Sequence, residues 1–195
     1  MAKGDTLFFI RRFLQQPGRV AALAPSSRSL ARAMLRGVAL DPGDVVVELG
    51  PGTGSFTALI APHVARGVRY LGIERDPVFH ARLCETYPSL RFALGSAEDA
   101  PKLLAEAGHE RANLVVSGLP LAAMHAELQQ RIVDATRAIL AEDGVFRQFS
   151  YVHFFPFPSS IGLRRKLRTA FRRLELSRPV LANLPPAFVY HGAFQ

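Results

Sequence analysis

A glycine-rich turn directly after a run of apolar residues is the feature that most restricts how this chain folds. The run covers residues 45–49 (Val-Val-Val-Glu-Leu) and leads into residues 50–54 (Gly-Pro-Gly-Thr-Gly). A short apolar run that ends at glycine is typical of a buried strand, and glycine lets the backbone approach a ligand where a side chain would block it. A helix is expected to begin at residues 55–57. The sequence therefore predicts a strand, a ligand-binding turn and a helix in succession.

The rest of the chain alternates short apolar runs with helical patterns, which indicates βα units on a mostly parallel sheet. Two late runs, 174–180 and 188–194, are joined by residues 183–186, a connection too short for a helical crossover, so we expect them to pair antiparallel. We therefore predict an α/β, Rossmann-like fold whose seven-stranded sheet is mostly parallel with an antiparallel last strand. The strands expected before the hairpin are 45–49, 70–74, 91–94, 114–117 and 145–151.

Helices are expected ahead of the sheet and between its strands. Residues 7–16 form the first helical pattern, and Pro17 ends it. A further helix spans the stripe from Leu128 to Leu140 and is expected to end at the turn 142–144 (Glu-Asp-Gly). Because 195 residues suit one full core, we expect residues 1–195 to form a single domain. Ser27 is predicted to cap a helix that carries Leu30, Ala31, Met34, Leu35 and Val38.

Composition limits the environment and the partners of the chain. The formal net charge is +8 and the pI is about 10.5, so the surface is expected to attract polyanions, either nucleic acid or the anionic face of a membrane. The single cysteine, Cys84, cannot form an internal disulfide, which fits a reducing cytoplasm. The chain has no apolar run of about 18 residues and no signal-peptide pattern, so we expect a cytoplasmic protein that does not span a membrane.

The glycine spacing distinguishes two kinds of nucleotide site. A dinucleotide site needs glycines at the first, third and sixth places of the turn, but here they hold the first, third and fifth, and Ser55 holds the sixth. Glu48 stands two residues before Gly50. S-adenosylmethionine (AdoMet) has no pyrophosphate but carries a positive ammonium and a positive sulfonium, which a carboxylate attracts. The turn therefore predicts an AdoMet site, and the lack of a following Gly-Lys-Ser/Thr excludes a Walker phosphate loop.

Residues after the next two strands complete the predicted cofactor site. Glu74 ends the second strand, where an acid accepts hydrogen bonds from both ribose hydroxyls. Residues 95–99 follow the third strand, where methyltransferases commonly bind adenine; the alternative interpretation of Glu98 and Asp99 is an acidic helix N-terminus. The residues predicted to bind AdoMet are Glu48, Gly50, Pro51, Gly52, Gly54, Glu74, Arg75, Ser96, Ala97, Glu98, Ser117 and Gly118.

The segment after the fourth strand argues against a nucleic-acid substrate. In enzymes that methylate amino groups of nucleic acids, this place usually holds Asp or Asn, then two prolines and an aromatic residue. Here Ser117 replaces the amide, and Leu121 stands where the aromatic side chain would stack on a base. A base would therefore lose its stacking platform.

Several motifs together resemble those of bacterial phospholipid N-methyltransferases. They are residues 24–27 (Ala-Pro-Ser-Ser), 48–54, 70–74 (Tyr-Leu-Gly-Ile-Glu), 117–121 (Ser-Gly-Leu-Pro-Leu) and 148–151 (Gln-Phe-Ser-Tyr). The resemblance implies a class I methyltransferase that methylates phosphatidylethanolamine stepwise toward phosphatidylcholine, with AdoMet as donor and S-adenosylhomocysteine (AdoHcy) as product. Because the family is related to the rRNA adenine dimethylases, rRNA adenine N6-methylation is the alternative. Arg147 departs from the pattern, since an uncharged residue is expected there.

The predicted catalytic residues lie at the ends of the fourth and fifth strands. A neutral amine must attack the methyl carbon of the sulfonium in line, so the lipid ammonium first loses a proton. We expect the Ser117 hydroxyl and backbone carbonyls around Leu119 to orient the amine, and Tyr151, His153 or His125 to accept the proton directly or through water. Each of these rings is alternatively a packing or surface residue. The six histidines have no paired ligand spacing, so we expect no metal.

Two amphipathic segments are expected to hold the protein peripherally on the inner face of the cell membrane. Within residues 1–16, Phe9 and Phe13 lie on the apolar side of a helical wheel and Arg11 and Arg12 on the polar side. A second segment begins at residue 153; its alternative interpretation is a helix that covers the sheet. A phospholipid is the expected partner and nucleic acid is not, whereas a non-catalytic membrane adaptor is the third hypothesis. The cations of this second segment expected to meet anionic lipid are Arg164, Arg165, Lys166 and Arg168.

Overall fold

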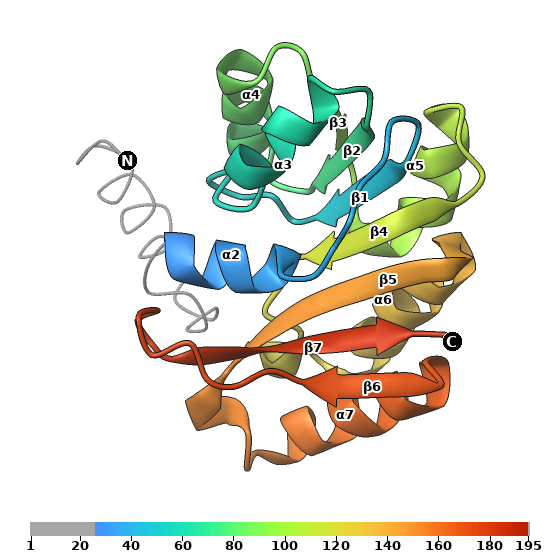
Figure 1. Cartoon of the computed structure of the whole chain (residues 1–195). Coiled ribbons are helices and arrows are strands. Elements are labelled where there is room, and N and C mark those ends of the chain that lie inside the picture. The colour runs from blue at the N-terminus through green and yellow to red at the C-terminus, as the bar shows by residue number, and fades with distance from the viewer. Residues whose placement is uncertain (1–25, 195) are drawn as a thin grey trace.

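The apolar runs of the sequence assemble into one seven-stranded sheet (Figure 1). In the computed structural model, which describes residues 26–194, its strands are β1 (Val45–Leu49), β2 (Arg69–Glu74), β3 (Arg91–Leu94), β4 (Ala112–Ser117), β5 (Leu140–Tyr151), β6 (Arg173–Leu176) and β7 (Ala187–Ala193). Their order is β3-β2-β1-β4-β5-β7-β6. The first five are parallel, and β7 runs antiparallel to both β5 and β6. The carboxyl ends of β1 to β5 therefore share the edge at which open α/β sheets bind ligands.

Helices cover both faces of the sheet. They are α2 (Arg28–Leu35), α3 (Thr57–Val64), α4 (Pro77–Thr86), α5 (Ala100–Glu106), α6 (Ala126–Ile139) and α7 (Pro158–Ala170). On one face, Leu30 of α2 and Ile60 of α3 pack with Val46 of β1. On the other face, Ile132 of α6 and Leu163 of α7 join the cluster around Val47. Figure 1 shows the same division, with α2 and α3 in front of the sheet and α5 and α6 behind it.

The predicted α/β architecture is confirmed, including the antiparallel strand. β1 and β3 coincide with the predicted strands, and β2 and β4 begin one and two residues earlier than expected. The final hairpin is present, although β6 is short and Val180 forms only an isolated bridge to Ala187. Apolar runs bounded by turns therefore located the strands reliably.

The boundary between α6 and β5 differs from the prediction. α6 ends at Ile139, and Leu140 already has extended backbone and pairs with β4. Ala112 of β4 lies opposite Leu140, and Leu114, two residues later, lies opposite Val145. Residues 141–144 of β5 therefore form a bulge. The prediction that the turn at 142–144 ends the helix was wrong, because these residues belong to the bulge inside β5.

The N-terminal end of α2 is fixed by Ser27, as predicted. The Ser27 side chain accepts a hydrogen bond from the Leu30 N–H at 3.1 Å, and the Ser27 N–H donates to Asn183 Oδ1 at 2.9 Å. The cap thus ties α2 to the connection between β6 and β7. The predicted stripe was too long by one turn, since α2 ends at Leu35 and Val38 lies beyond it.

The expected helix at residues 7–16 lies outside the described residues, and so do Phe9, Arg11, Arg12 and Phe13. Between residues 26 and 194, no helix is both long and apolar enough to cross a membrane.

Candidate active site

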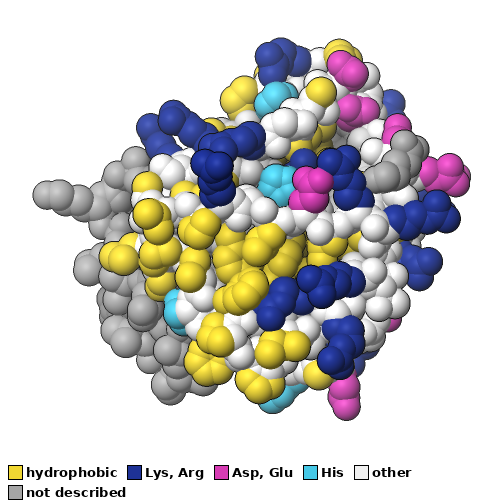
Figure 2. All heavy atoms as spheres, turned by 60° about the horizontal axis from the view of Figure 1, so that its bottom comes forward, with side chains coloured by type: hydrophobic (Ala, Val, Ile, Leu, Met, Phe, Trp, Pro, Cys, Tyr) yellow, Lys and Arg dark blue, Asp and Glu magenta, His cyan; other side chains and the backbone are white. Residues whose placement is uncertain are grey.

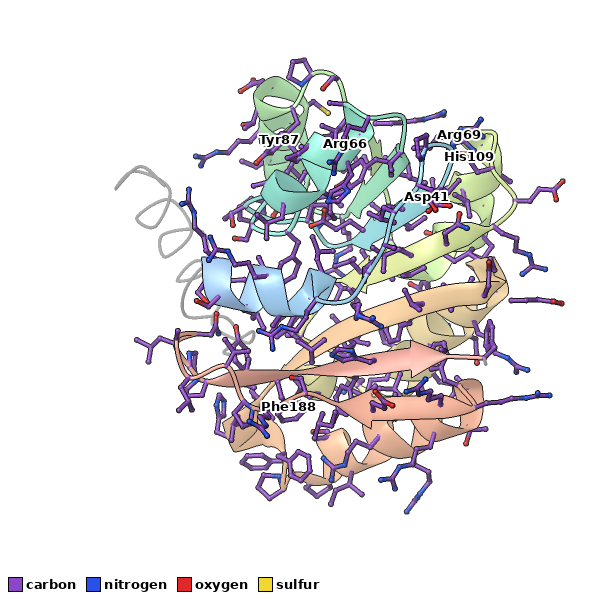
Figure 3. All side chains as sticks on the ribbon, in the orientation of Figure 1. Asp41, Arg66, Arg69, Tyr87, His109 and Phe188 are labelled. Atoms are coloured by element: carbon purple, nitrogen blue, oxygen red, sulfur yellow. The ribbon has the colours of Figure 1, made fainter. Side chains whose placement is uncertain are left out.

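The glycine turn after β1 has the backbone conformation that its sequence predicts. Gly50, Gly52 and Gly54 have φ values of 68°, 57° and 80°, a region that side-chain-bearing residues rarely adopt. A Cβ atom on Gly52 would meet nothing closer than 4.0 Å, so the turn leaves space there. A Cβ on Gly54 would lie 3.1 Å from the ring of Tyr87, which Figure 3 labels at the end of α4. The turn is therefore enclosed at Gly54 and open at Gly52.

Glu48 lies completely buried beneath this turn. Its Oε2 accepts hydrogen bonds from the Tyr70 hydroxyl at 2.7 Å and the Thr57 hydroxyl at 2.8 Å. Its Oε1 is buried and has no hydrogen-bond partner in residues 26–194. Burial raises the pKa of Glu48 to about 7, although the hydrogen bonds from Tyr70 and Thr57 oppose the shift. Glu48 is therefore a carboxyl group that a nearby cation would convert to its ionised form.

Glu74, at the end of β2, holds the turn from the other side. Its Oε2 accepts the Gly52 N–H and its Oε1 accepts the Asp76 N–H, both at 2.9 Å. Each carboxylate oxygen has further lone pairs, so these bonds leave capacity for ligand hydroxyl groups. The neighbouring Arg75 is exposed. The predicted acid is therefore within hydrogen-bonding distance of the predicted turn.

The segment after β3 combines the two interpretations made from its sequence. Ala97–Asp99 form a 3-10 turn that leads into α5, so Glu98 and Asp99 do lie at a helix start. Ser96 donates to Glu98 Oε1 at 3.2 Å, and Arg131 of α6 binds Glu98 Oε2. This guanidinium holds the pKa of Glu98 below its usual range. The sequence analysis missed Arg131, because its partner lies more than thirty residues away in the chain.

The loop after β4 contacts the glycine turn through backbone atoms. The Gly118 N–H donates to the Leu49 carbonyl at 2.8 Å. A Cβ atom on Gly118 would lie 2.6 Å from the Gly50 carbonyl oxygen, and one on Gly50 would collide with the Leu119 side chain. Two predicted groups of site residues, the turn and residues 117–119, are thus brought into contact.

Two buried glutamines hold this loop: Gln148, which belongs to the predicted motif 148–151 but was given no role, and Gln129, which was not predicted. Gln148 of β5 donates through Nε2 to the Leu119 carbonyl at 2.8 Å, and that carbonyl also accepts the Leu121 N–H at 2.9 Å. Gln129 of α6 donates through Nε2 to the carbonyls of Leu121 at 2.8 Å and Met124 at 3.2 Å. The Leu119 carbonyl, which was predicted to orient the substrate, thus already accepts two hydrogen bonds within the protein. The sequence signal for Gln148 was its place in the motif 148–151, and the structure puts it opposite Ser117 in the neighbouring strand.

Tyr151, His153 and His125 were predicted as alternative proton acceptors. Tyr151 ends β5 and His153 follows it, whereas His125 lies between the loop after β4 and α6. Tyr151 is buried, and its ring stacks on exposed His153 with centroids 5.6 Å apart. Burial raises the pKa of Tyr151, so its hydroxyl keeps its proton at neutral pH and is suited to hydrogen bonding rather than to acting as a phenolate base. His125 is the exposed N-cap residue of α6.

These residues fit a cationic nucleoside such as AdoMet. The turn is open at Gly52, an acid stands at the ends of both β1 and β2, and a buried carboxyl oxygen of Glu48 has no donor within residues 26–194. Free backbone and carboxylates suit a ligand with positive ammonium and sulfonium groups and no phosphate.

Comparisons with known proteins agree with this site. No protein-family model matches the chain. Ornithine lipid N-methyltransferase of Singulisphaera acidiphila is 36% identical over 149 residues, which cover 75% of this chain and 78% of that protein. Ribosomal RNA small subunit methyltransferase A of Thermobifida fusca is 42% identical over 57 residues, 29% of this chain and 17% of that protein.

Solved structures share the whole fold at low sequence identity. The TehB-like methyltransferase of Corynebacterium glutamicum has a TM-score of 0.64 at 13% identity, and the match covers 100% of both chains. Fibrillarin of Aeropyrum pernix, solved with bound AdoMet, has a TM-score of 0.63 at 18% identity over 83% of this chain and 73% of its own. Fold and site together define a class I AdoMet-dependent methyltransferase. The chain belongs to the family of the Singulisphaera ornithine lipid N-methyltransferase.

Proposed function

We propose that the protein transfers methyl groups from AdoMet to the amine of a membrane lipid. The family relationship supports a lipid amine, and it adds ornithine lipid to the phosphatidylethanolamine that the motifs imply. The observation that carries the proposal is an exposed apolar surface at the same sheet edge as the glycine turn. A class I methyltransferase acting only on soluble substrates has no need for such a surface.

This surface, the strand-end patch, joins two loops. The first follows β5, and the second connects β6 to β7. The Val152 N–H donates to the Pro186 carbonyl at 2.9 Å, and the Phe155 ring packs edge-on against Phe188, labelled in Figure 3, at 5.4 Å. In the second loop, Leu181 is 78% exposed and Leu184 is 81% exposed, more than any other large apolar side chain of the described chain. The patch consists of Val152, Phe155, Phe157, Ile161, Leu181 and Leu184.

Cations of α7 stand beside the patch, as an anionic membrane surface would require. Figure 2 shows apolar side chains gathered on one face of the molecule with Lys and Arg groups adjoining them. Arg165 and Arg168 are exposed. By contrast, Arg164 lies over the Phe155 ring at 4.0 Å, and Lys166 donates to Gln129 Oε1 at 3.0 Å. Of the four predicted cations, we therefore assign membrane contact to Arg165 and Arg168.

In the proposed mechanism, backbone and carboxylates hold the cofactor. The glycine turn, Glu48 and Glu74 would hold its charged and hydroxyl groups, and residues 96–98 would hold its base. Bound AdoMet supplies a methyl group activated by the positive sulfur. The lipid amine, after losing a proton to water, forms the new N–C bond as the C–S bond breaks and the bonding pair passes to sulfur. Ser117 and Tyr151 would orient the amine or its departing proton through their hydroxyl groups.

A transfer assay tests the proposed substrate. Purified full-length protein and methyl-labelled AdoMet would be incubated with vesicles of phosphatidylethanolamine, vesicles of ornithine lipid, or rRNA. Label in either lipid is the expected result. Label in rRNA alone would replace the proposal with the RNA alternative, and label in none of them would favour the adaptor hypothesis.

Vesicle binding tests the patch separately. Replacing Leu181 and Leu184 by serine should weaken binding to anionic vesicles by about a hundredfold, because two aliphatic side chains inserted in an apolar layer contribute about 3 kcal/mol. The matched control is Val78→Ser, which removes an exposed apolar side chain of α4, outside the patch. Equal binding by the double variant and the control would contradict the assignment.

A further inference from the structure

In the buried side-chain amide of Gln148, the nitrogen is hydrogen-bonded and the oxygen has no partner among the described residues. Gln148 lies directly opposite Ser117 in the parallel pair β4 and β5, and its side chain is fully buried. Its Nε2 donates to the Leu119 carbonyl at 2.8 Å and to the Phe149 carbonyl at 2.5 Å. Both neighbours are acceptors, so they demand the NH2 group at this end of the amide. The rotation of the amide is therefore fixed by backbone carbonyls of the loop after β4 and of β5.

The opposite end of the same amide is an acceptor with no donor. Gln148 Oε1 is buried and has no hydrogen-bond partner among residues 26–194. Two residues further along β5, and so on the same face of the strand, Ser150 Oγ is also buried and has no partner in the described part of the chain. Buried polar atoms are normally paired, and clustered exceptions point to a ligand or to water.

The position of these two oxygen atoms next to the loop after β4 indicates what kind of ligand they would bind. Ser150 lines a small pocket between the loop after β4 and the end of β5, together with Pro120, Ala122, Ala123, Phe149, Tyr151 and Phe154. The Leu119 carbonyl, which would otherwise face an incoming amine, is already occupied by two donors. The Leu119 carbonyl is therefore engaged, whereas two buried side-chain oxygens of the neighbouring β5, Gln148 Oε1 and Ser150 Oγ, have no donor among residues 26–194.

We propose that Gln148 Oε1 and Ser150 Oγ accept hydrogen bonds from the N–H groups of the methyl-accepting amine, and that Leu119 serves to hold Gln148. This inference rests on the proposed lipid-amine function and identifies its substrate subsite. Hydrogen bonds to the N–H groups would turn the nitrogen lone pair toward the methyl donor. A primary amine offers two such N–H groups, a monomethyl amine one, and a dimethyl amine none. The contribution of Gln148 must then decrease with each methyl group added.

The decisive variant is Gln148→Leu, tested beside Gln129→Leu. Both glutamines are buried and both donate to carbonyls of the same loop, but Gln129 Oε1 already has a donor in Lys166. Kinetics would be measured with the full-length protein on short-chain lipids that carry a primary, a monomethyl and a dimethyl amine. AdoHcy affinity would be measured for each variant by calorimetry.

For Gln148→Leu we expect kcat/KM to fall about thirtyfold on the primary amine, the loss typical of one hydrogen bond to a polarised group. The loss of kcat/KM should be smaller on the monomethyl amine. On the dimethyl amine it should be no larger than the loss caused by Gln129→Leu. The affinity for AdoHcy should not change. Gln129→Leu should slow all three acceptors by one common factor. Ser150→Ala should follow the graded pattern more weakly.

Two results would overturn the inference. One is an equal loss on all three acceptors for Gln148→Leu, which would make it a structural support like Gln129. The other is loss of AdoHcy affinity by the same factor, which would assign Gln148 to the cofactor. If the wild-type protein methylates no lipid, the proposed function fails, and calorimetry of the primary amine with the AdoHcy complex still decides the subsite. Equal binding by wild type and Gln148→Leu, or no binding by either, would then refute it.

Discussion

The two halves of the sheet form their parts of the site by different means. Around β1 and β2, the backbone forms most of the candidate cofactor site: three glycines with positive φ open a turn, and a single carboxylate, Glu74, pins it through the Gly52 N–H. Around β4 and β5, buried side-chain amides hold the loop through its carbonyls. The first half is specified by a short local motif, whereas the second depends on residues that meet only in the folded chain. A cofactor common to many enzymes can use a fixed backbone cradle, while an acceptor that differs between enzymes is met by side chains.

The largest effect is expected from Gly118→Ala, which disturbs the backbone contact between the two halves of the site. Its Cβ would lie 2.6 Å from the Gly50 carbonyl oxygen, and neither backbone can move without shifting the turn or the loop. We expect loss of about 2 kcal/mol of unfolding free energy, as for other overpacked sites, and of about a hundredfold in kcat/KM.

The control for Gly118→Ala is Gly162→Ala in α7, where a Cβ would meet nothing within 4 Å. This helix substitution should raise the unfolding free energy by about 0.5 kcal/mol or more and leave the kinetics unchanged. Chemical denaturation and steady-state kinetics measure both variants. Equal behaviour of the two would mean that the halves are not coupled through backbone contact.

A smaller effect is expected in the cofactor half, from Glu48→Gln. The variant keeps an oxygen for Thr57 and Tyr70 but cannot ionise, so AdoMet affinity should fall by about tenfold, corresponding to one pKa unit of lost charge interaction. In the wild type, affinity should rise as the pH passes upward through the Glu48 pKa of about 7, because the cation favours the ionised form. Calorimetry between pH 6 and pH 8, a window of about one unit on either side of that pKa, should show no such slope for the variant.

Stability without ligand should have the opposite dependence. The folded-state pKa of Glu48 is raised from 4.5 to about 7, so its contribution is complete below about pH 4.5 and is lost as the pH rises through about 7. The unfolding free energy of wild type relative to Glu48→Gln should therefore decline over this range. A constant difference would show that Glu48 is ionised in the free protein.

The smallest effect is expected at Arg147 in the acceptor half, whose side chain lies on the other face of the sheet from Gln148. Its guanidinium is buried on the sheet face opposite Gln148, its Nε has no partner in the described chain, and burial lowers its pKa. Arg147→Met should raise the unfolding free energy by about 1 kcal/mol, because an apolar side chain has no charge to desolvate. A rise in stability with normal kinetics is the expected outcome. A loss of vesicle binding or turnover would instead assign this charge to the acceptor.

The local sequence was sufficient for the fold and for the conformation of the glycine turn. Apolar runs located β1 and β3, Ser27 capped α2, and the glycine spacing placed the open turn at Gly52. It was not sufficient where contacts are distant in sequence. The Arg131 pair with Glu98 and the anchoring of Gln148 by Leu119 need the sheet order before they can be recognised. Burial of Tyr151 likewise follows from packing and not from its place in a motif.

Gly50 and Gly118 bring two main chains together with no side chain between them. The distance between the glycine turn and the loop after β4 is consequently set by the course of the polypeptide. Descendants of such a protein can exchange one acceptor for another by altering the pocket walls at residues 120–123 and 149–154. The donor and that distance then stay the same while the repertoire of amines changes.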